Sequence, residues 1–319
     1  MTIAVTGATG FVGGHIAQAL ATAGASVRGV ARRPDAAPWL AALPGVHFAR
    51  ADLADPEALA AAFAGADAVV ANAALGSYQG TLDDFVRTNV AGTENTLRAA
   101  AAAGVRRVVY ISTVAVYATV INRAMTEDQP RYGPRRRLFS WTHLGTDWRY
   151  CVSKLAAEER AWALATELGL ALTVLRPGPV YGSRDPKWTA RLLRSVQRPL
   201  VFAPTVGIPA VHAGDVANAV VAALGAPASE GRAYSIAGPP TPLADIVGGL
   251  ARMGGRARVV RVPVPVWVGY ATDAAARDLG FRACPLEEGL IEALSAVHPA
   301  AGIASAESVA APPAAGLPG

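Results

Sequence analysis

A tyrosine and a lysine four residues apart, Tyr150 and Lys154, form the pattern in this sequence best suited to proton chemistry. Residues four apart on a helix lie on the same face, one turn from each other. A lysine ammonium beside a phenol favours the ionised phenol, so this spacing predicts that Lys154 lowers the pKa of Tyr150 from about 10 toward neutral. The alternative is a surface helix that carries both residues by coincidence, because one short motif matches many unrelated sequences.

A glycine-rich turn near the N-terminus is the second chemical feature. Residues 3–5 predict a short buried strand, and residues 6–14 read TGATGFVGG before a helical pattern begins. A strand, a glycine turn and a helix start offer backbone N–H groups and a positive helix end to a pyrophosphate. Gly7 can adopt a positive φ, Gly10 lets backbone approach phosphate, and Gly13 lets the helix pack on the strand. The pattern predicts a dinucleotide site, with a glycine turn that binds nothing as the alternative.

The composition argues against several classes of protein. The chain has 319 residues, of which 52% are hydrophobic and 17% charged, which suits one large domain or two coupled ones. The net charge of +5 comes without a dense basic helix, so no nucleic-acid partner is expected. Two cysteines, Cys151 and Cys284, make neither a disulfide framework nor a metal site. Without a signal sequence or a bilayer-spanning apolar run, we expect a cytoplasmic protein with no membrane partner.

Alternating strands and helices must position these residues. Short apolar runs predict strands at 26–31, 46–50, 68–71 and 107–112, with helical patterns at 56–64 and, with breaks, at 82–103. This alternation predicts an α/β fold: a doubly wound parallel Rossmann sheet with a smaller C-terminal α/β substrate lobe. Ligands of such sheets bind at the carboxyl ends of the strands. We therefore expect the chemistry just after Val5, Val30, Arg50, Val70 and Ile111.

The end of the strand expected at 26–31 bears on the identity of the cofactor. A free ribose 2′-hydroxyl is usually held there by Asp or Glu, whereas a 2′-phosphate is matched by arginine. The strand is followed by Arg32 and Arg33, and either guanidinium could bind a phosphate bidentately. This pattern favours NADP over NAD, with two solvated loop arginines as the alternative. Asp52 and Leu53, after the next strand, could meet the adenine; the alternative is a helix N-cap at Asp55 or a plain turn.

A series of further motifs follows the glycine turn in order. They are TGATGFVG at 6–13, Asp52-Leu53, NAA at 72–74, NVAGT at 89–93, YISTVAVY at 110–117, Tyr150-x-x-x-Lys154, RPGPVYG at 176–182, VHAGDVA at 211–217 and YSIAG at 234–238. This set resembles the extended short-chain dehydrogenase/reductases, also called the NAD-dependent epimerase/dehydratase family. The resemblance runs over most of the chain, to about residue 290.

The resemblance implies a catalytic set of hydroxyl, tyrosine and lysine. The family's hydroxyl residue lies four before the Tyr of a V-Y pair, which is Thr113 here, with Ser112 as the second choice. The resemblance implies that Thr113 hydrogen-bonds the substrate oxygen and that Tyr150 passes a proton to or from it. Lys154 would tune Tyr150 and hold the nicotinamide ribose. Hydride would move between the substrate carbon and the nicotinamide, whose chemistry belongs to the cofactor.

The implied cofactor site combines the glycine turn with the later motifs. Its expected members are Gly7, Thr9, Gly10, Phe11, Val12, Gly13, Arg32, Arg33, Asp52, Leu53, Asn72, Ala73, Ala74, Asn89, Ser112, Tyr150, Lys154, Pro177, Gly178 and Val180. The last three follow the sixth strand, expected at 172–175, and should line the nicotinamide end. A small-molecule substrate is implied, and a homodimer is compatible with the family pattern.

Departures from the family pattern narrow the reaction. Dehydratases carry an acidic pair directly after the active-site Thr, but Val114 and Ala115 stand there and carry no proton. Nucleotide-sugar epimerases recognise the diphosphate with an Asn and an Arg, at positions occupied here by Pro179 and Ile208. Neither of these side chains can bind phosphate. The balance favours an NADP-dependent reductase of a ketone or aldehyde that carries no nucleotide.

Two rival functions stay open. A nucleotide-sugar epimerase is the first, because Arg184, Arg191 and Arg194 are close enough in sequence to serve a diphosphate, unless they are solvated helix arginines. A dinucleotide-sensing regulator without turnover is the second. Such proteins typically lose the Tyr–Lys pair, which this chain retains, so the enzyme is favoured.

The segment 118–149 is longer than expected between the fifth strand and the Tyr150 helix. Long loops in compact domains often have a function. We expect it to cover the substrate, with Arg137, His143 and Trp148 as substrate contacts, or else to be a solvated basic loop. We expect His212 to be structural rather than catalytic.

The motif order also predicts the domain organisation. We expect the dinucleotide domain at 1–180, with 211–238 returning to its sheet, and the substrate lobe at 181–210 and 239–298. The tail at 299–319 consists mainly of Ala, Pro and Gly, which predicts disorder.

Overall fold

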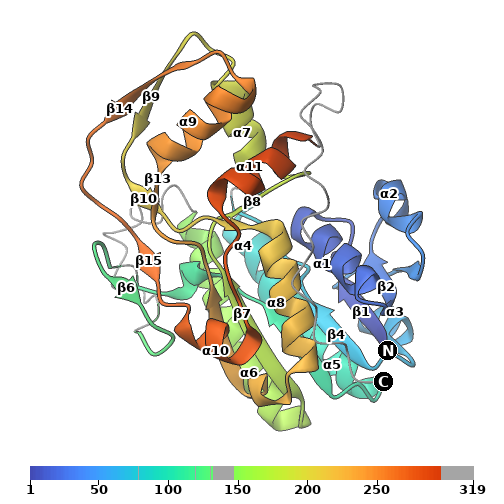
Figure 1. Cartoon of the computed structure of the whole chain (residues 1–319). Helices are drawn as coiled ribbons and strands as arrows, with labels where there is room; N and C mark the ends of the chain where they lie inside the picture. Colours follow the sequence, from blue (N-terminus) through green and yellow to red (C-terminus); the bar gives the residue numbers. More distant parts are fainter. Residues whose placement is uncertain (78, 119, 130, 132–146, 296–319) are drawn as a thin grey trace.

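Seven parallel strands form the central sheet of the computed structural model, which describes residues 1–77, 79–118, 120–129, 131 and 147–295 (Figure 1). Their spatial order is β12 (Arg232–Ile236), β7 (Ala171–Pro177), β5 (Arg107–Ile111), β4 (Ala68–Ala71), β1 (Thr2–Thr6), β2 (Ser26–Ala31) and β3 (Val46–Arg50). The chain runs outward from β1 to β3 and then returns to β4 on the other side. A crevice therefore opens at the carboxyl ends of β1 and β4. The predicted doubly wound parallel sheet is confirmed.

The inner strands are continuous apolar runs because both faces of the sheet are covered. All four residues of β4 are buried, and so are the last four of β1 and of β5. The predicted bounds of β2, β3 and β4 agree with the structure. β5 ends at Ile111, one residue earlier than predicted, although the Ser112 N–H still donates to Leu175 O at 2.7 Å.

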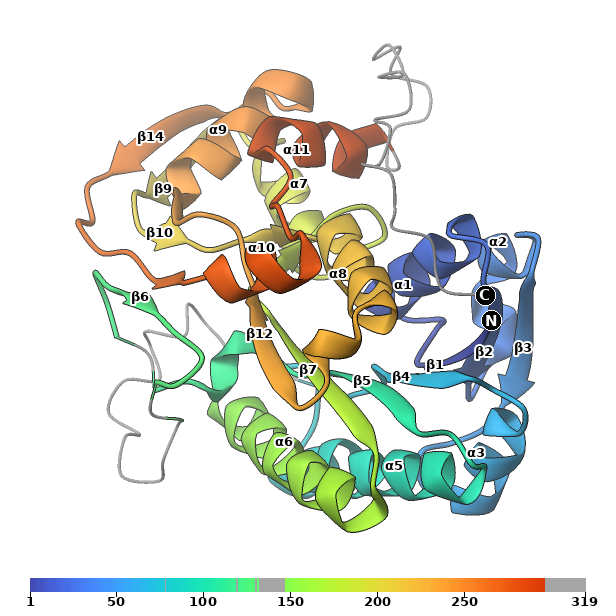
Figure 2. The same cartoon turned by 60° about the horizontal axis from the view of Figure 1, so that its bottom comes forward.

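Helices cover the two faces of the sheet separately (Figure 2). On one face lie α3 (Pro56–Phe63), α5 (Gly92–Ala102) and α6 (Trp148–Leu168); on the other lie α1 (Phe11–Thr22) and α8 (Ala213–Gly225). Each face has its own apolar core, one built around Leu97 and Leu164 and the other around Ile16 and Val220. The sheet between these cores holds the strand ends at fixed positions.

The segment expected to be helical at 82–103 is broken, as its pattern suggests. A short α4 (Leu82–Phe85) begins with a capping box between Thr81 and Asp84. A π-helical stretch, η2 (Val86–Ala91), follows and leads directly into α5. Such π-helical turns are rare and often lie at functional sites.

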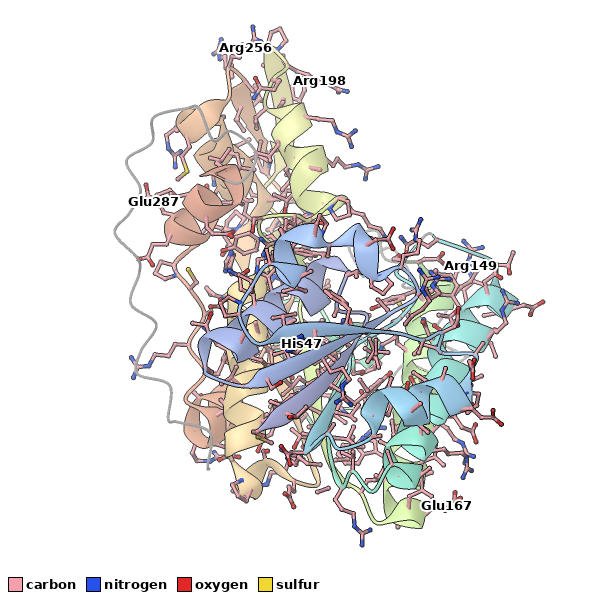
Figure 3. The ribbon with its side chains drawn as sticks, turned by 90° about the vertical axis from the view of Figure 1, so that its right-hand side faces the viewer. His47, Arg149, Glu167, Arg198, Arg256 and Glu287 are labelled. Atoms are coloured by element: carbon pink, nitrogen blue, oxygen red, sulfur yellow. The ribbon has the colours of Figure 1, made fainter. Side chains whose placement is uncertain are left out.

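A second group of elements forms a smaller α/β unit, which we call the small lobe. It consists of α7 (Trp188–Ser195), β9 (Leu200–Pro204), α9 (Leu243–Gly254), β14 (Arg258–Val262) and α11 (Leu286–Ser295). β9 and β14 pair in parallel, and the lobe has its own core around Val196, Leu250 and Leu290. Arg198 and Arg256 lie at the outer end of this lobe (Figure 3).

Of the segment 211–238, which was expected to return to the main sheet, only the second part forms a strand of that sheet. Residues 233–236 do join it as part of β12 beside β7. The strand at the start of 211–224 does not, because β11 (Val211–His212) pairs with β8 (Val180–Tyr181) at the edge of the crevice. Here α8 covers a face of the sheet in place of an added strand.

The remaining short elements connect these layers. They are η1 (Pro34–Ala36), α2 (Pro38–Ala41), η3 (Val114–Val116), β6 (Ala124–Met125), β10 (Gly207–Ile208), η5 (Pro227–Ser229), β13 (Thr241–Pro242), β15 (Gly269–Tyr270) and α10 (Asp273–Leu279). No helix within the described part of the chain is long and apolar enough to cross a membrane. The expectations for Arg137, His143 and the 299–319 tail fall outside the described residues.

Candidate active site

A cavity of about 820 Å³ lies at the carboxyl ends of the strands, where the strand order reverses. It is lined by every residue expected to hold the cofactor except Asn89: Gly7, Thr9, Gly10, Phe11, Val12, Gly13, Arg32, Arg33, Asp52, Leu53, Asn72, Ala73, Ala74, Ser112, Tyr150, Lys154, Pro177, Gly178 and Val180. Thr113 lines it as well. The fold therefore brings residues from the ends of β1, β2, β3, β4, β5 and β7 to one place.

The glycine turn has the backbone shape that a pyrophosphate requires. Gly7 adopts a φ of +68°, and the Gly10 N–H donates to Gly7 O at 2.9 Å. A Cβ on Gly13 would lie 2.1 Å from Gly7 O, so helix and turn touch only because this residue has no side chain. Gly10 is the N-cap residue of α1 and has no side chain to bond the first-turn N–H groups, which leaves them for an anion. These features fit a dinucleotide cofactor.

Replacing Gly13 with alanine is expected to push α1 away from the turn. Overpacking of this kind costs about 1–3 kcal/mol of unfolding free energy, and the displaced N–H groups should weaken cofactor binding at least about tenfold. Gly225→Ala is the matched control, because a Cβ at Gly225 meets nothing within 4 Å. Fluorescence titration with NADPH measures the Kd. An unchanged Kd in Gly13→Ala would show that the turn does not bind the cofactor.

The structure brings Thr113 and Tyr150 together. Thr113 follows β5 and caps η3, accepting a hydrogen bond from the Ala115 N–H at 3.2 Å. Tyr150 lies in the first turn of α6, where its ring packs edge-on against Phe85. Both side chains line the cavity, and the Thr113 hydroxyl opposes the rise that burial causes in the pKa of Tyr150. A carbonyl oxygen placed between them would meet two hydroxyl groups, which is the arrangement for polarising and protonating it.

Lys154 does not act on Tyr150 as the sequence predicts. Its ammonium donates to the phenol of Tyr110 and to Ile111 O, both at 2.8 Å. The predicted fall in the pKa of Tyr150 is therefore wrong for this structure: burial raises that pKa to about 12, with Cys151 raising it further and the Thr113 hydrogen bond opposing. Burial lowers the pKa of Lys154 to about 7, and the charge of Glu158 opposes that shift.

Two buried charged residues beside the catalytic set were not predicted. Glu158 and Arg176 are 0% and 1% exposed and form an ion pair at 2.6 Å. The signal for Glu158 was its spacing, because it lies four residues after Lys154 on the same helix face. Arg176 stood inside a quoted motif, but nothing local indicated that its guanidinium turns inward.

Asn89 is a correction to the expected cofactor site. Its side chain is buried and does not line the cavity. The amide accepts from the Leu75 N–H at 2.7 Å, and its Nδ2 donates to Leu75 O at 3.2 Å and to Ser153 Oγ at 3.0 Å. Asn89 thus holds the backbone of Leu75, which lines the cavity, and does not reach the cavity itself. Its side chain extends from η2 toward α6 and the segment after β4.

Several residues that line the cavity were not predicted. They come from the segment after β4, from η2 and from the segment before α7: Leu75, Gly76, Gln79, Arg87, Thr88, Asp185, Pro186 and Lys187. Lys187 Nζ donates to Ser77 O at 3.2 Å. Its sequence signal was rarity, because Lys154 and Lys187 are the only two lysines of the chain and both line this cavity.

The other expected contacts lie elsewhere. Trp148 begins α6 and does not line the cavity. The Arg184 guanidinium stacks on Trp39, 3.9 Å from the ring centroid. His212 caps α8 by accepting from the Gly214 N–H at 3.2 Å, in keeping with the structural role expected for it. In the described ranges, no group of three His, Cys, Asp or Glu side chains could hold a metal ion.

Comparisons with known proteins agree with this geometry. The model of the NAD dependent epimerase/dehydratase family matches residues 3–237. The 2-alkyl-3-oxoalkanoate reductase of Stenotrophomonas maltophilia (strain K279a) is 33% identical over 270 residues, which cover 81% of this chain and 77% of that protein. Cinnamoyl-CoA reductase 1 of Petunia hybrida is 34% identical over 194 residues, 56% of this chain and 54% of the relative, so that match spans about half of each.

Solved structures show the same fold. MoeE5 in complex with UDP-glucuronic acid and NAD is 26% identical with a TM-score of 0.77, covering 94% of this chain and 99% of that one. The UDP-glucuronic acid 4-epimerase from Bacillus cereus in complex with NAD has a TM-score of 0.78 at 22% identity, with the same coverage. The chain is therefore a member of the NAD-dependent epimerase/dehydratase family of oxidoreductases and epimerases.

Proposed function

We propose that this protein is an NADP-dependent reductase that converts a ketone or aldehyde group of a small molecule into an alcohol. The observation that carries the proposal is the position of Thr113 and Tyr150, which both line the same dinucleotide cavity. The cofactor supplies the hydride when bound. Thr113 orients the substrate oxygen, and Tyr150 donates the proton that this oxygen requires. Lys154 binds the ribose of the nicotinamide.

Two arginines support NADP as the cofactor. Arg32 and Arg33 line the cavity directly after β2, and Arg32 Nε lies 4.0 Å from Asp52 Oδ2. Arg32 is 78% exposed, so its guanidinium is free to turn toward a phosphate. Planar guanidinium groups bind phosphate bidentately. NAD is the alternative cofactor, with Asp52 at the adenosine end.

Cofactor preference is the direct test of this proposal. We expect NADPH to exceed NADH at least about tenfold in kcat/KM, since a charge-assisted hydrogen bond contributes about 1.5–3 kcal/mol. The double variant Arg32→Ala/Arg33→Ala should abolish this preference. It should lower kcat/KM for NADPH and leave kcat/KM for NADH nearly unchanged. Arg50→Ala, at the end of β3 and outside the cavity lining, is the control. A preference for NADH, or NAD that copurifies with the protein, would overturn NADP as the cofactor.

The substrates to try first are 3-oxo acids and their esters. The similar S. maltophilia protein is a 2-alkyl-3-oxoalkanoate reductase, and this name indicates a substrate with a ketone at carbon 3 of the acyl chain. Asp185, Pro186 and Lys187 enter the cavity from the segment before the small lobe. We therefore propose that residues 181–210 and 239–298 bind the substrate, while 1–180 and 211–238 bind the cofactor.

A nucleotide-sugar epimerase is the second candidate. The observation in its favour is that MoeE5, 26% identical over nearly the whole chain, binds UDP-glucuronic acid and NAD. Lys187 in the cavity could meet a diphosphate, although Pro179 and Ile208 cannot. Incubation with UDP-glucose and UDP-glucuronic acid, followed by analysis for the 4-epimers, separates the two candidates.

A further inference from the structure

Three side chains of α6 contact three consecutive residues at the end of β5. Tyr150 and Thr113 line the same cavity, and the Thr113 hydroxyl opposes the rise that burial causes in the pKa of Tyr150. Lys154 Nζ donates to Ile111 O at 2.8 Å, one residue before Ser112. The Ser112 hydroxyl donates to Glu158 Oε2 at 2.6 Å. Since Tyr150, Lys154 and Glu158 are spaced four apart, one face of the helix holds the whole 111–113 segment.

Glu158 is itself held rigidly. Arg176 Nη2 and Nε donate to its two carboxylate oxygens at 2.6 and 3.1 Å, and Arg131 Nη1 lies 3.8 Å away. Arg176 Nη1 also donates to the Tyr117 hydroxyl at 2.7 Å, which shares a hydrogen bond with Ser235. Burial alone would raise the pKa of Glu158, but Arg176 and then Ser112 lower it below its ordinary value. The Glu158 carboxylate is thus held by Arg176 and Ser112, and Ser112 lines the cavity.

We propose that Glu158 is a positioning residue of this active site, which fixes Ser112 so that Thr113 stays against Tyr150 and which supplies a negative charge one helical turn from Lys154. The inference rests on the proposed roles of Thr113, Tyr150 and Lys154. The charge matters because the described partners of the Lys154 ammonium are neutral. The Tyr110 phenol and the Ile111 carbonyl of β5 accept its hydrogen bonds, so Glu158 is the neighbouring carboxylate that favours its charged form.

Ser112→Ala separates positioning from charge, because it removes the link to Thr113 and leaves the ion pair intact. We expect kcat for NADPH-dependent reduction of ethyl acetoacetate to fall about 10- to 100-fold, as a misplaced catalytic group does. The KM for NADPH should stay within about twofold. Ser229→Ala is the matched control: its hydroxyl is also fully buried and hydrogen-bonded, to Ala226 O at 2.7 Å, but lies outside the cavity lining. An unchanged kcat in Ser112→Ala would overturn the positioning role.

The charge is tested without turnover, which keeps it separate from the proposed function. Because the chain has two lysines, protein labelled with [13Cε]lysine gives two side-chain NMR signals, and Lys187→Arg assigns them. We compare the titration of Lys154 in the wild type and in Glu158→Gln/Arg176→Met. The glutamine can still accept from Ser112, and neither position 158 nor position 176 is left with a charge that has lost its partner.

The Lys154 midpoint is expected near 7 in the wild type and about one pH unit lower in the double variant, a tenfold change in proton affinity. Ser112→Ala should leave the Lys154 midpoint unchanged, because the Glu158 carboxylate remains in that variant. An unchanged midpoint in the double variant would overturn the electrostatic role of Glu158. Normal NMR behaviour with no reduction of ethyl acetoacetate or any 3-oxo acid would instead count against the reductase function alone.

Discussion

Tyr150→Phe is expected to lower kcat about 10³-fold while the Kd for NADPH changes less than about twofold. The substitution removes one hydroxyl, and a positioned general acid contributes about 10²–10⁴-fold to a rate. The phenylalanine ring keeps the edge-on contact with Phe85, 6.2 Å between centroids, so the wall of the cavity should be preserved. NADPH oxidation measures kcat, and quenching of protein fluorescence by NADPH measures the Kd.

The control for this variant is Tyr181→Phe. Tyr181 is also a buried tyrosine, but it packs in the small lobe and does not line the cavity. It should retain both activity and cofactor binding. Near-normal turnover in Tyr150→Phe would refute the assignment of Tyr150 as proton donor. A loss of NADPH binding in the same variant would instead assign its hydroxyl to the cofactor.

Arg176→Met is expected to lower the free energy of unfolding by about 3–5 kcal/mol, which is typical when one partner of a buried ion pair is removed. Glu158 is 0% exposed and would keep a carboxylate without its main partner. Methionine fills a similar volume, so the loss comes from the unpaired charge rather than from a cavity. Urea denaturation followed by circular dichroism measures the effect.

Arg98→Ala provides the comparison at the surface. Arg98 pairs with Glu94 and Glu167, each at 3.1 Å, but it is 42% exposed, and exposed pairs contribute about 0–1 kcal/mol. Glu158→Gln/Arg176→Met should be more stable than Arg176→Met alone, because it removes the buried Glu158 carboxylate that Arg176→Met leaves without its ion-pair partner. If Arg176→Met lowers the free energy of unfolding no more than Arg98→Ala does, the buried Glu158–Arg176 pair does not stabilise the fold.

Much of the fold and of the cavity could be predicted from local patterns. A strand buried on both faces has to be a continuous apolar run, so β4 was readable to the residue. The glycine turn was readable because Gly7 must adopt a positive φ and Gly13 must carry no side chain. Strand ends in a parallel sheet meet at one edge, which explains why the glycine turn, Asp52-Leu53 and Asn72 line one cavity.

The sequence by itself thus determined the parallel sheet, the dinucleotide cavity and the identity of Thr113 and Tyr150 as neighbours there. Only the tertiary structure decided where Lys154 and Glu158 direct their charges. Lys154 of α6 bonds Tyr110 of β5, 44 residues earlier, and Glu158 of α6 bonds Arg176 of β7, 18 residues later. Helical spacing places side chains on a shared face, but burial and distant partners set their pKa values, and neither can be read from the spacing.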